Sequence, residues 1–278
     1  MVVYISKMFI LALDGLEYNV VMKLRCRSLL QEVFGYIDVS RFKNLITPAI
    51  WTSFITGKEP SEHGVHYWWQ FSQYEWFDRL VHWVRFNMPI IKNMPSTKIK
   101  RALKVLGLRT PSKRDLKVPT IFDMIKPSVA LFVPGYNEET WIHYFYSEAF
   151  EKGVKEAERA VWYVHRYRKQ KLFEILERRL NWKLFMVWFD LADLIGHLHM
   201  GRASLKIMKV YFELARLAAR VKEILSDDTL LMIVSDHGMK PGGEHSPGAF
   251  YSFSMDPAWR PDKITDYFHF IVHNLRTT

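Results

Sequence analysis

The chain has 278 residues and a formal net charge of +10. Hydrophobic residues make up 49% of it and charged residues 24%, which excludes a disordered protein and allows one large core. No run approaches the roughly 18 apolar residues of a membrane span. The single cysteine, Cys26, excludes an internal disulfide. The positive charge suits an anionic substrate, a nucleic acid or an acidic membrane surface, and it does not choose among them.

Residues 4–13 form a short apolar run that ends at Asp14-Gly15. This pattern predicts a buried parallel strand with a carboxylate at its C-terminal end. Because the run lacks a small-residue cleavage site, we interpret it as a first strand and not as a signal peptide, and we expect a cytoplasmic protein. Residues 17–34 have helical spacing, and residues 37–45 form a weaker connecting stretch.

Thr47 stands directly before Pro48, in a stretch that favours a helix until Gly57. Proline is preferred at the first helical position and threonine just ahead of it, so a helix is predicted to begin here. Free backbone N–H groups and the helix dipole at such an end favour an anion such as phosphate. The segment alone is also explained by a simple helix cap. A role for Thr47 as a nucleophile depends on metal ligands elsewhere in the chain.

Residues 66–119 differ in composition from the rest of the chain. An aromatic-rich part at 66–86 precedes a basic part at 98–117, in which Asp115 is the only acidic residue. We interpret this block as an insertion or cap within one catalytic domain that spans residues 1–278. Three roles stay open for it: a solvated basic face beside a small aromatic core, a substrate-binding cap, or an interfacial membrane patch.

Strands and helices alternate through the second half of the chain. Apolar strands are predicted at residues 128–133, 184–189 and 230–234, and helices at 148–180 and 204–225. This alternation predicts an α/β fold, with a mostly parallel sheet covered by helices on both faces.

Three carboxylates stand at or just beyond the C-terminal ends of predicted strands: Asp14, Asp193 and Asp236. Ligands bind at that edge in open α/β sheets. Histidines follow them in the pattern Asp-x-x-x-His, Asp-His and a later His: His197, His237 and His245. Mixed aspartate and histidine ligands suit zinc, manganese or iron better than magnesium or calcium.

Together these segments resemble the alkaline phosphatase superfamily, and most closely the prokaryotic members of its type I phosphodiesterase/nucleotide pyrophosphatase branch. The resemblance rests on Thr47, Thr56-Gly57, Pro60 and His63-Gly64, and on the order of the aspartates and histidines that follow. It covers both ends of the chain and leaves out most of residues 66–180. It implies an alkaline-phosphatase-like three-layer sandwich with an inserted cap.

The resemblance also implies two divalent transition-metal ions, for which we expect zinc, with manganese or iron as alternatives. One ion would be held by Asp193, His197 and His245, the other by Asp14, Asp236 and His237, with the Thr47 oxygen between or beside them. Metal coordination would activate the threonine hydroxyl, which is otherwise a poor nucleophile. The implied course is attack by Thr47 on phosphorus, a phosphothreonine intermediate, and hydrolysis by metal-bound water.

One departure limits the resemblance. Nucleotide pyrophosphatases usually have Pro-Asn two and three positions after the nucleophile, where this chain has Ala49 and Ile50. The resemblance therefore does not extend to nucleotide specificity.

The predicted function is a two-metal phosphoester hydrolase, a phosphodiesterase, acting on an anionic phosphoester. A phosphomonoesterase or phosphoryl transferase on the same site is the alternative within this chemistry. A non-catalytic basic protein that binds nucleic acid or membrane, with a vestigial metal site, is the alternative from another class. Intact ligands together with Thr47 argue against the vestigial case. Nothing in the sequence indicates nucleic acid specifically or fixes an oligomeric state, and peripheral membrane contact stays open.

Overall fold

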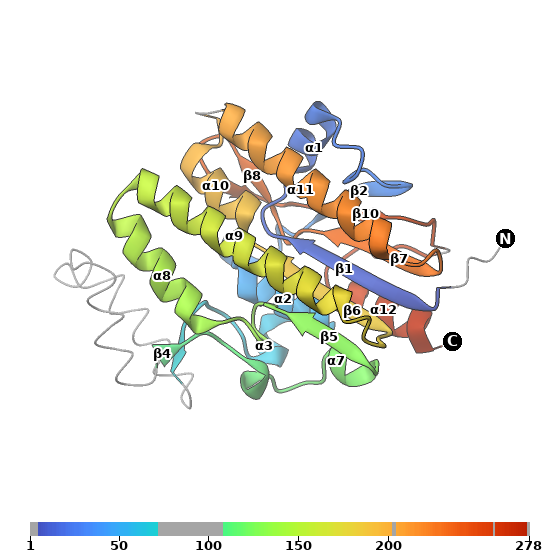
Figure 1. Cartoon of the computed structure of the whole chain (residues 1–278). Coiled ribbons are helices and arrows are strands. Elements are labelled where there is room, and N and C mark those ends of the chain that lie inside the picture. The colour runs from blue at the N-terminus through green and yellow to red at the C-terminus, as the bar shows by residue number, and fades with distance from the viewer. Residues whose placement is uncertain (1–4, 72–107, 202–203, 258, 277–278) are drawn as a thin grey trace.

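The computed structural model describes residues 5–71, 108–201, 204–257 and 259–276. Its centre is a six-stranded sheet in the order β2-β10-β7-β1-β6-β5 (Figure 1). The strands are β1 Lys7–Leu13, β2 Val33–Asp38, β5 Ser128–Leu131, β6 Leu184–Phe189, β7 Thr229–Val234 and β10 Gly248–Phe253. Strands β7, β1, β6 and β5 are mutually parallel, and β10 runs antiparallel to both β7 and β2.

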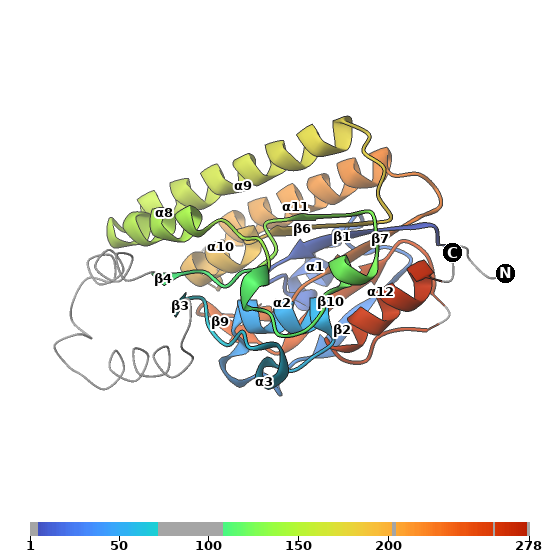
Figure 2. The same ribbon diagram turned by 90° about the horizontal axis from the view of Figure 1, so that it is seen from below.

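Helices lie on both faces of this sheet (Figure 2). One face carries α9 Val154–Glu177, α10 Leu191–His199 and α11 Ser204–Ile224, with α8 Thr140–Glu151 beside α9 and α1 Tyr18–Leu24 beside α11. The other face carries α2 Thr47–Thr56, α3 Pro60–His63, α7 Ile121–Met124 and α12 Asp266–Arg276. The predicted three-layer α/β fold is confirmed.

The central strands are buried on both faces because helices cover each side. Residues Met8–Leu13 of β1 and all of β6 and β7 are buried, as their nearly unbroken apolar sequences predict. Phe9 of β1 stacks on Phe185 of β6 at 4.9 Å between ring centres. These strands form the rigid base from which the loops at their C-terminal ends extend.

Two short ribbons complete the described structure. β8 Gly238–Lys240 pairs with β9 Glu244–Ser246, and β3 Gln70–Phe71 pairs with β4 Leu108–Arg109. The predicted cap at 66–119 falls partly outside the described residues, since 72–107 are not among them. The ribbon β3–β4 joins the two ends of that block, and its role as a cap stays a prediction.

The helix predicted at 17–34 is wrong beyond its first turns. α1 ends at Leu24, because Arg25 adopts a left-handed conformation and its N–H caps the helix on Met22 and Val21. Residues 33–38 form the edge strand β2, so the connecting stretch predicted at 37–45 also begins inside a strand. Short segments with a mixed pattern fit both periodicities, and here pairing with β10 decides the outcome.

The helix predicted at 148–180 is two helices. Gly153, with φ of 106°, interrupts the helix between α8 and α9. α8 begins eight residues earlier than predicted, at Thr140.

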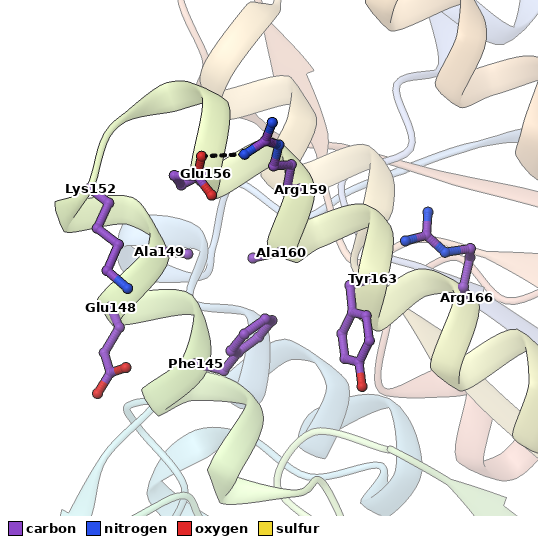
Figure 3. Close-up of a pocket in the computed structure, with 9 residues that line it drawn as sticks. All are labelled: Phe145, Glu148, Ala149, Lys152, Glu156, Arg159, Ala160, Tyr163 and Arg166. Atoms are coloured by element: carbon purple, nitrogen blue, oxygen red, sulfur yellow. Dashed lines mark hydrogen bonds and ion pairs between the residues drawn. The ribbon is translucent and has the colours of Figure 1, made fainter.

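A cavity of about 350 Å³ lies on the outer side of this helical hairpin (Figure 3). Among the described residues, no helix is both long enough and apolar enough to cross a membrane.

His63 locks the turn that follows α2. Its Nε2–H donates to Ser53 Oγ at 3.0 Å, and its Nδ1 accepts the Val65 N–H at 3.1 Å, so the buried ring is held neutral. Burial, together with the nearby His66, lowers the pKa of His63 from 6.5 to about 3. His63 therefore stabilises this turn through two hydrogen bonds of its buried, neutral ring.

We expect this histidine to weaken the fold in acid. Below pH 6.5 the unfolded chain takes up a proton that folded His63 refuses until about pH 3. The free energy of unfolding should therefore fall by up to about 1.4 kcal/mol per pH unit as pH drops through that window. Urea unfolding of wild type and His63→Gln with a chelator present, between pH 4 and 8, should give a shallower slope for the variant. The exposed His269→Gln is the control, and equal slopes for His63→Gln and wild type would contradict the assignment.

Candidate metal centre

Three adjacent parallel strands bring the aspartates together. Leu13 at the end of β1 pairs with Phe189 of β6, and Ala12 pairs with Val234 of β7, so the three strands end at one level. Asp14 and Asp236 follow β1 and β7 directly and are both buried. The Gly15 N–H donates to Asp236 Oδ1 at 3.3 Å, which ties these two loops together.

Asp193 lies one helical turn before His197 on α10, a short helix that the sequence did not predict. Their spacing of four residues places both side chains on one face, with Asp193 Oδ1 3.4 Å from His197 Nε2. Gly15 allows α10 to approach this closely. A side chain at Gly15, whose φ is +65°, would meet the Asp193 backbone at 2.7 Å.

The other two histidines come from the ribbon β8–β9. His237 directly precedes β8, and His245 lies in β9. All three imidazoles direct Nδ1 at a backbone carbonyl: His197 at Gly243 O at 2.6 Å, His237 at Gly238 O at 3.0 Å and His245 at Leu45 O at 3.1 Å. An Nδ1–H donated to a carbonyl leaves Nε2 as the free electron pair, which is the form that binds metals.

The Nε2 atoms and the carboxylate oxygens form two clusters. In the first, Asp193 Oδ1 lies 3.3 Å from His245 Nε2, and the two Nε2 atoms of His197 and His245 lie 3.0 Å apart. In the second, His237 Nε2 lies 3.4 Å from both Asp14 Oδ1 and Asp236 Oδ2. Ligands about 2.0–2.1 Å from a tetrahedral zinc ion would be separated by about 3.3 Å, which these distances match.

His237 connects the two clusters, since its Nε2 also lies 3.9 Å from Asp193 Oδ1. It can therefore group with Asp14 and Asp236, or with Asp193 and His245. All six residues predicted as ligands meet at this edge of the sheet. Their predicted division between two ions stays a prediction.

The carboxylates need a cation. Both oxygens of Asp14, Oδ1 of Asp193 and Oδ2 of Asp236 are buried with no hydrogen-bond donor in the described part of the chain. Burial, and then the negative charges of Asp236 and Asp193, raise the pKa of Asp14 well above its usual range. Although burial would lower the pKa of His197, Asp193 raises it. Unpaired buried carboxylates facing imidazole electron pairs fit divalent metal ions bound through oxygen and nitrogen.

The helix predicted at this point is present, but it begins at Thr47, with Ile46 and not Thr47 in the capping position. Thr47 is buried beside the second cluster. Its Oγ1 lies 3.5 Å from His237 Nε2. The free N–H groups expected at this helix end are fewer than predicted, because those of Ala49 and Ile50 both donate to the Ile46 carbonyl. The start of α2 therefore contributes the Thr47 hydroxyl to the cluster, and fewer free backbone N–H groups than expected for binding an anion.

One cavity of about 1100 Å³ opens from this edge of the sheet. Asp14, Thr47, Asp193, His197 and His245 are among the residues that line it. Its volume slightly exceeds the roughly 300–1,000 Å³ usual for small-molecule sites. Five of the seven predicted site residues thus face a space that can hold a substrate.

A family model described as type I phosphodiesterase/nucleotide pyrophosphatase matches residues 9–251. The chain belongs to this family. The predicted place in the alkaline phosphatase superfamily is therefore confirmed, and the chain shares a family with metal-dependent phosphoester hydrolases. No curated protein matches the sequence.

Solved structures support the same fold. The PH0037 protein of Pyrococcus horikoshii superposes with a TM-score of 0.51 at 11% identity, over 99% of this chain and 98% of that one. The alkaline phosphatase of the Antarctic bacterium TAB5 gives 0.51 at 11% identity over 99% of both chains, and a mutant of it with bound magnesium gives 0.54. At this identity the likeness concerns the fold alone.

Several residues that line the cavity at the metal ligands were not predicted from the sequence. His143 and Tyr146 of α8, and Trp188 and Asp190 around the end of β6, line the same cavity. Asp190 had one usable signal, since it directly follows a predicted strand. His143 and Tyr146 had none, because the predicted helix began only at residue 148.

Glu17 is a further residue that sequence patterns do not reveal. Its buried carboxylate accepts the Met239 N–H at 2.9 Å and the Ser246 hydroxyl at 2.7 Å, on both strands of the ribbon that carries His245. The other oxygen accepts both the backbone and the side-chain N–H of Asn19. Glu17 therefore fixes this ribbon to the loop that follows Asp14.

We expect the purified protein to bind two Zn²⁺ ions per chain. Two clusters of buried carboxylates and imidazoles supply the ligands, so removing one shared group should affect both ions. Elemental analysis after dialysis against zinc should give two ions in wild type, and fewer in His237→Ala. One ion or none in wild type, with no uptake from added Zn²⁺ or Mn²⁺, would contradict the two-ion site.

Glu17→Gln should weaken zinc binding by about ten- to a hundredfold, the usual effect of losing a residue that orients metal ligands. Competition with a chromophoric chelator measures this. Glu213→Gln is the matched control, because it also removes a buried, multiply bonded carboxylate, but one that lies outside the site. Equal zinc affinity in Glu17→Gln and wild type would show that the ribbon is positioned without Glu17.

Proposed function

We propose that this protein is a two-metal phosphodiesterase that acts through a phosphothreonine intermediate on Thr47. The observation that carries the proposal is the position of the Thr47 hydroxyl, 3.5 Å from His237 Nε2, in a residue that lines a cavity large enough for a substrate. Membership of the family supports the phosphoester class. The nucleophile, the intermediate and the preference for diesters are our inference.

The six residues Asp14, Asp193, His197, Asp236, His237 and His245 would hold two divalent ions, which when bound stabilise negative charge on the phosphoryl oxygens and favour the threonine alkoxide. Thr47 supplies the nucleophilic oxygen. A bond forms from Oγ1 to phosphorus as the bond to the leaving alcohol breaks. Attack by water on phosphothreonine then releases the phosphate product and restores the hydroxyl.

The chain prepares Thr47 for this step. As a β-branched residue in the first turn of a helix, it has few rotamers available. Pro48 and the buried residues that follow hold α2 against the sheet, so the hydroxyl stays directed at the cluster. Such preorganisation lowers the entropic cost of attack.

The charges around the cavity favour a diester over a monoester. A phosphomonoester carries more negative charge than a diester, and it benefits from a fixed cationic side chain. No lysine or arginine is among the described residues that line the cavity. A preference for bis(p-nitrophenyl) phosphate over p-nitrophenyl phosphate, in the presence of Zn²⁺ or Mn²⁺, would agree with the proposal, and the reverse preference would indicate the monoesterase.

Thr47→Ala should lower kcat at least about a thousandfold, because loss of a nucleophile normally removes several orders of magnitude. Thr47→Ser should retain much of the activity, and zinc content should change little in either variant. The buried Thr52→Val, on the same helix, is the control. Acid-quenched wild type should carry a phosphoryl group on the peptide containing Thr47. Activity of Thr47→Ala within tenfold of wild type would make water the direct nucleophile.

A further inference from the structure

Helices α8 and α9 form a hairpin that extends past the C-terminal edge of the central sheet (Figure 1 and Figure 2). Six consecutive residues at its tip, 150–155, are exposed. They include two apolar side chains, Phe150 and Val154, of which Val154 is 52% exposed. Apolar side chains at a projecting tip contribute little to the core of this chain, and exposed apolar groups that cluster mark an interaction site.

The exposed side chains of residues 141–166 cover the tip and the outer side of the hairpin, and we name them the hairpin surface. The structure describes every residue in this range. Five of the exposed side chains are apolar or aromatic: Trp141, Phe145, Phe150, Val154 and Tyr163. Four are basic, namely Lys152, Lys155, Arg159 and Arg166, and only Glu151 is acidic. A solvated helix face is ordinarily polar, so this share of aromatic residues calls for a partner.

The aromatic and basic members of the hairpin surface lie together. Phe145 of α8 is 5.6 Å from Tyr163 of α9 and 6.3 Å from Trp141, measured between ring centres. The outer cavity of about 350 Å³ lies between the two helices at this place, and Lys152 and Arg166 are in its lining (Figure 3). The two helices therefore present one mixed surface and not separate stripes.

Most of the positive charge on the hairpin surface has no acidic partner. Arg159 pairs with the half-buried Glu156 at 2.6 Å. Within the described part of the chain, Lys152, Lys155 and Arg166 form no ion pair. An anionic partner can therefore contact three cations without first breaking an ion pair.

We propose that the hairpin surface docks the protein on an anionic phospholipid bilayer. Tryptophan and tyrosine favour the headgroup region, because part of each side chain is apolar and part is polar. Lysine can keep its stem among apolar groups while its ammonium group reaches a lipid phosphate. Each basic residue near an anionic bilayer strengthens binding by about fivefold. Docking requires no catalysis, so this inference does not depend on the proposed function.

The observations favour a bilayer over a nucleic acid. Nucleic acids bind where basic side chains line a groove and follow successive phosphates. Here apolar side chains stand at the tip, and Glu148 and Glu156 lie in the lining of the outer cavity. A bilayer accepts apolar side chains at such a tip, and the net charge of +10 attracts the protein to an anionic surface.

Sedimentation with vesicles tests the docking. The zinc-loaded protein, freed of unbound metal, should bind vesicles of equal parts phosphatidylglycerol and phosphatidylcholine. Binding to pure phosphatidylcholine should be at least about tenfold weaker, and added salt should weaken binding to the mixed vesicles. Equal binding to both kinds of vesicle, or binding to neither, would overturn the proposal.

Charge variants locate the contact. Lys152→Gln/Lys155→Gln should lower the affinity for mixed vesicles about twentyfold, since each lost charge weakens binding about fivefold. Lys222→Gln/Lys263→Gln is the matched control, because it removes the same charge from exposed lysines at the end of α11 and before α12. An equal loss in the two double variants would make net charge alone responsible and contradict the assignment.

An aromatic pair of variants tests the apolar contribution. Trp141→Ser should weaken vesicle binding several-fold, because the exposed indole then no longer enters the headgroup region. Trp259→Ser is the control, since Trp259 is a tryptophan of similar exposure outside the hairpin. Unchanged binding in Trp141→Ser would exclude the aromatic part of the hairpin surface from the contact.

A fluorophore reports whether the tip itself meets the bilayer. In a Cys26→Ala background, an environment-sensitive dye on Val154→Cys should brighten when mixed vesicles are added. The same dye on Ile224→Cys, an exposed position at the end of α11, should not respond. Vesicle binding without a response at Val154→Cys would place the contact on another surface. Binding of a single-stranded oligonucleotide that Lys152→Gln/Lys155→Gln abolishes, with no vesicle binding, would assign the hairpin surface to nucleic acid. Either result overturns the proposal.

Discussion

The structure depends on holding three carboxylates, Asp14, Asp193 and Asp236, in a buried space where they repel one another. Ionised carboxylates without partners are among the least favourable groups to bury, and here four of their oxygens lack a donor in the described part of the chain. Strands β1, β6 and β7 are parallel and end at the same level, so the residues that follow them meet at one edge of the sheet. As a charged site this arrangement is stable only with cations present. The fold therefore brings the carboxylates together at an electrostatic cost that bound cations would offset.

The surrounding residues follow from that constraint. Imidazoles can complete such a site only if their Nε2 atoms are unprotonated and directed inward, and a backbone carbonyl at each Nδ1 secures this. The ribbon β8–β9 positions two of the three imidazoles, and Glu17 attaches this ribbon to the first loop through Met239 and Ser246. Gly15 serves the same end by permitting α10 to lie against that loop. Residues that never touch a substrate thereby determine where the ligands stand.

Much of this arrangement could be predicted from sequence, and the reasons differ by element. Strands β1, β6 and β7 are continuous apolar runs, so the sequence predicts their positions and the polar residues that follow them. The sequence also predicts Thr47 and the six aspartates and histidines as candidate site residues. Edge strand β2 could not be predicted, because its pairing with β10 decides that it is a strand. The break between α8 and α9 could not be predicted either, because it depends on the backbone conformation of Gly153. Glu17, His143 and Tyr146 could not be found either. Their roles arise from contacts between residues far apart in the chain, which no local pattern records.

Net charge illustrates how little a global property says about a site. The chain carries +10 overall, which suits an anionic substrate, a nucleic acid or an acidic membrane surface without choosing among them. In the described structure several of the basic residues, among them Lys152, Arg159 and Arg166, line the outer cavity between α8 and α9, and none is among the described residues that line the cavity at the metal ligands. Under the proposed function, divalent ions would supply the positive charge at the phosphoryl group, so a lysine or arginine would not be required there. The remaining side chains that line the cavity, many of them aromatic, are then free to contact the organic part of the substrate.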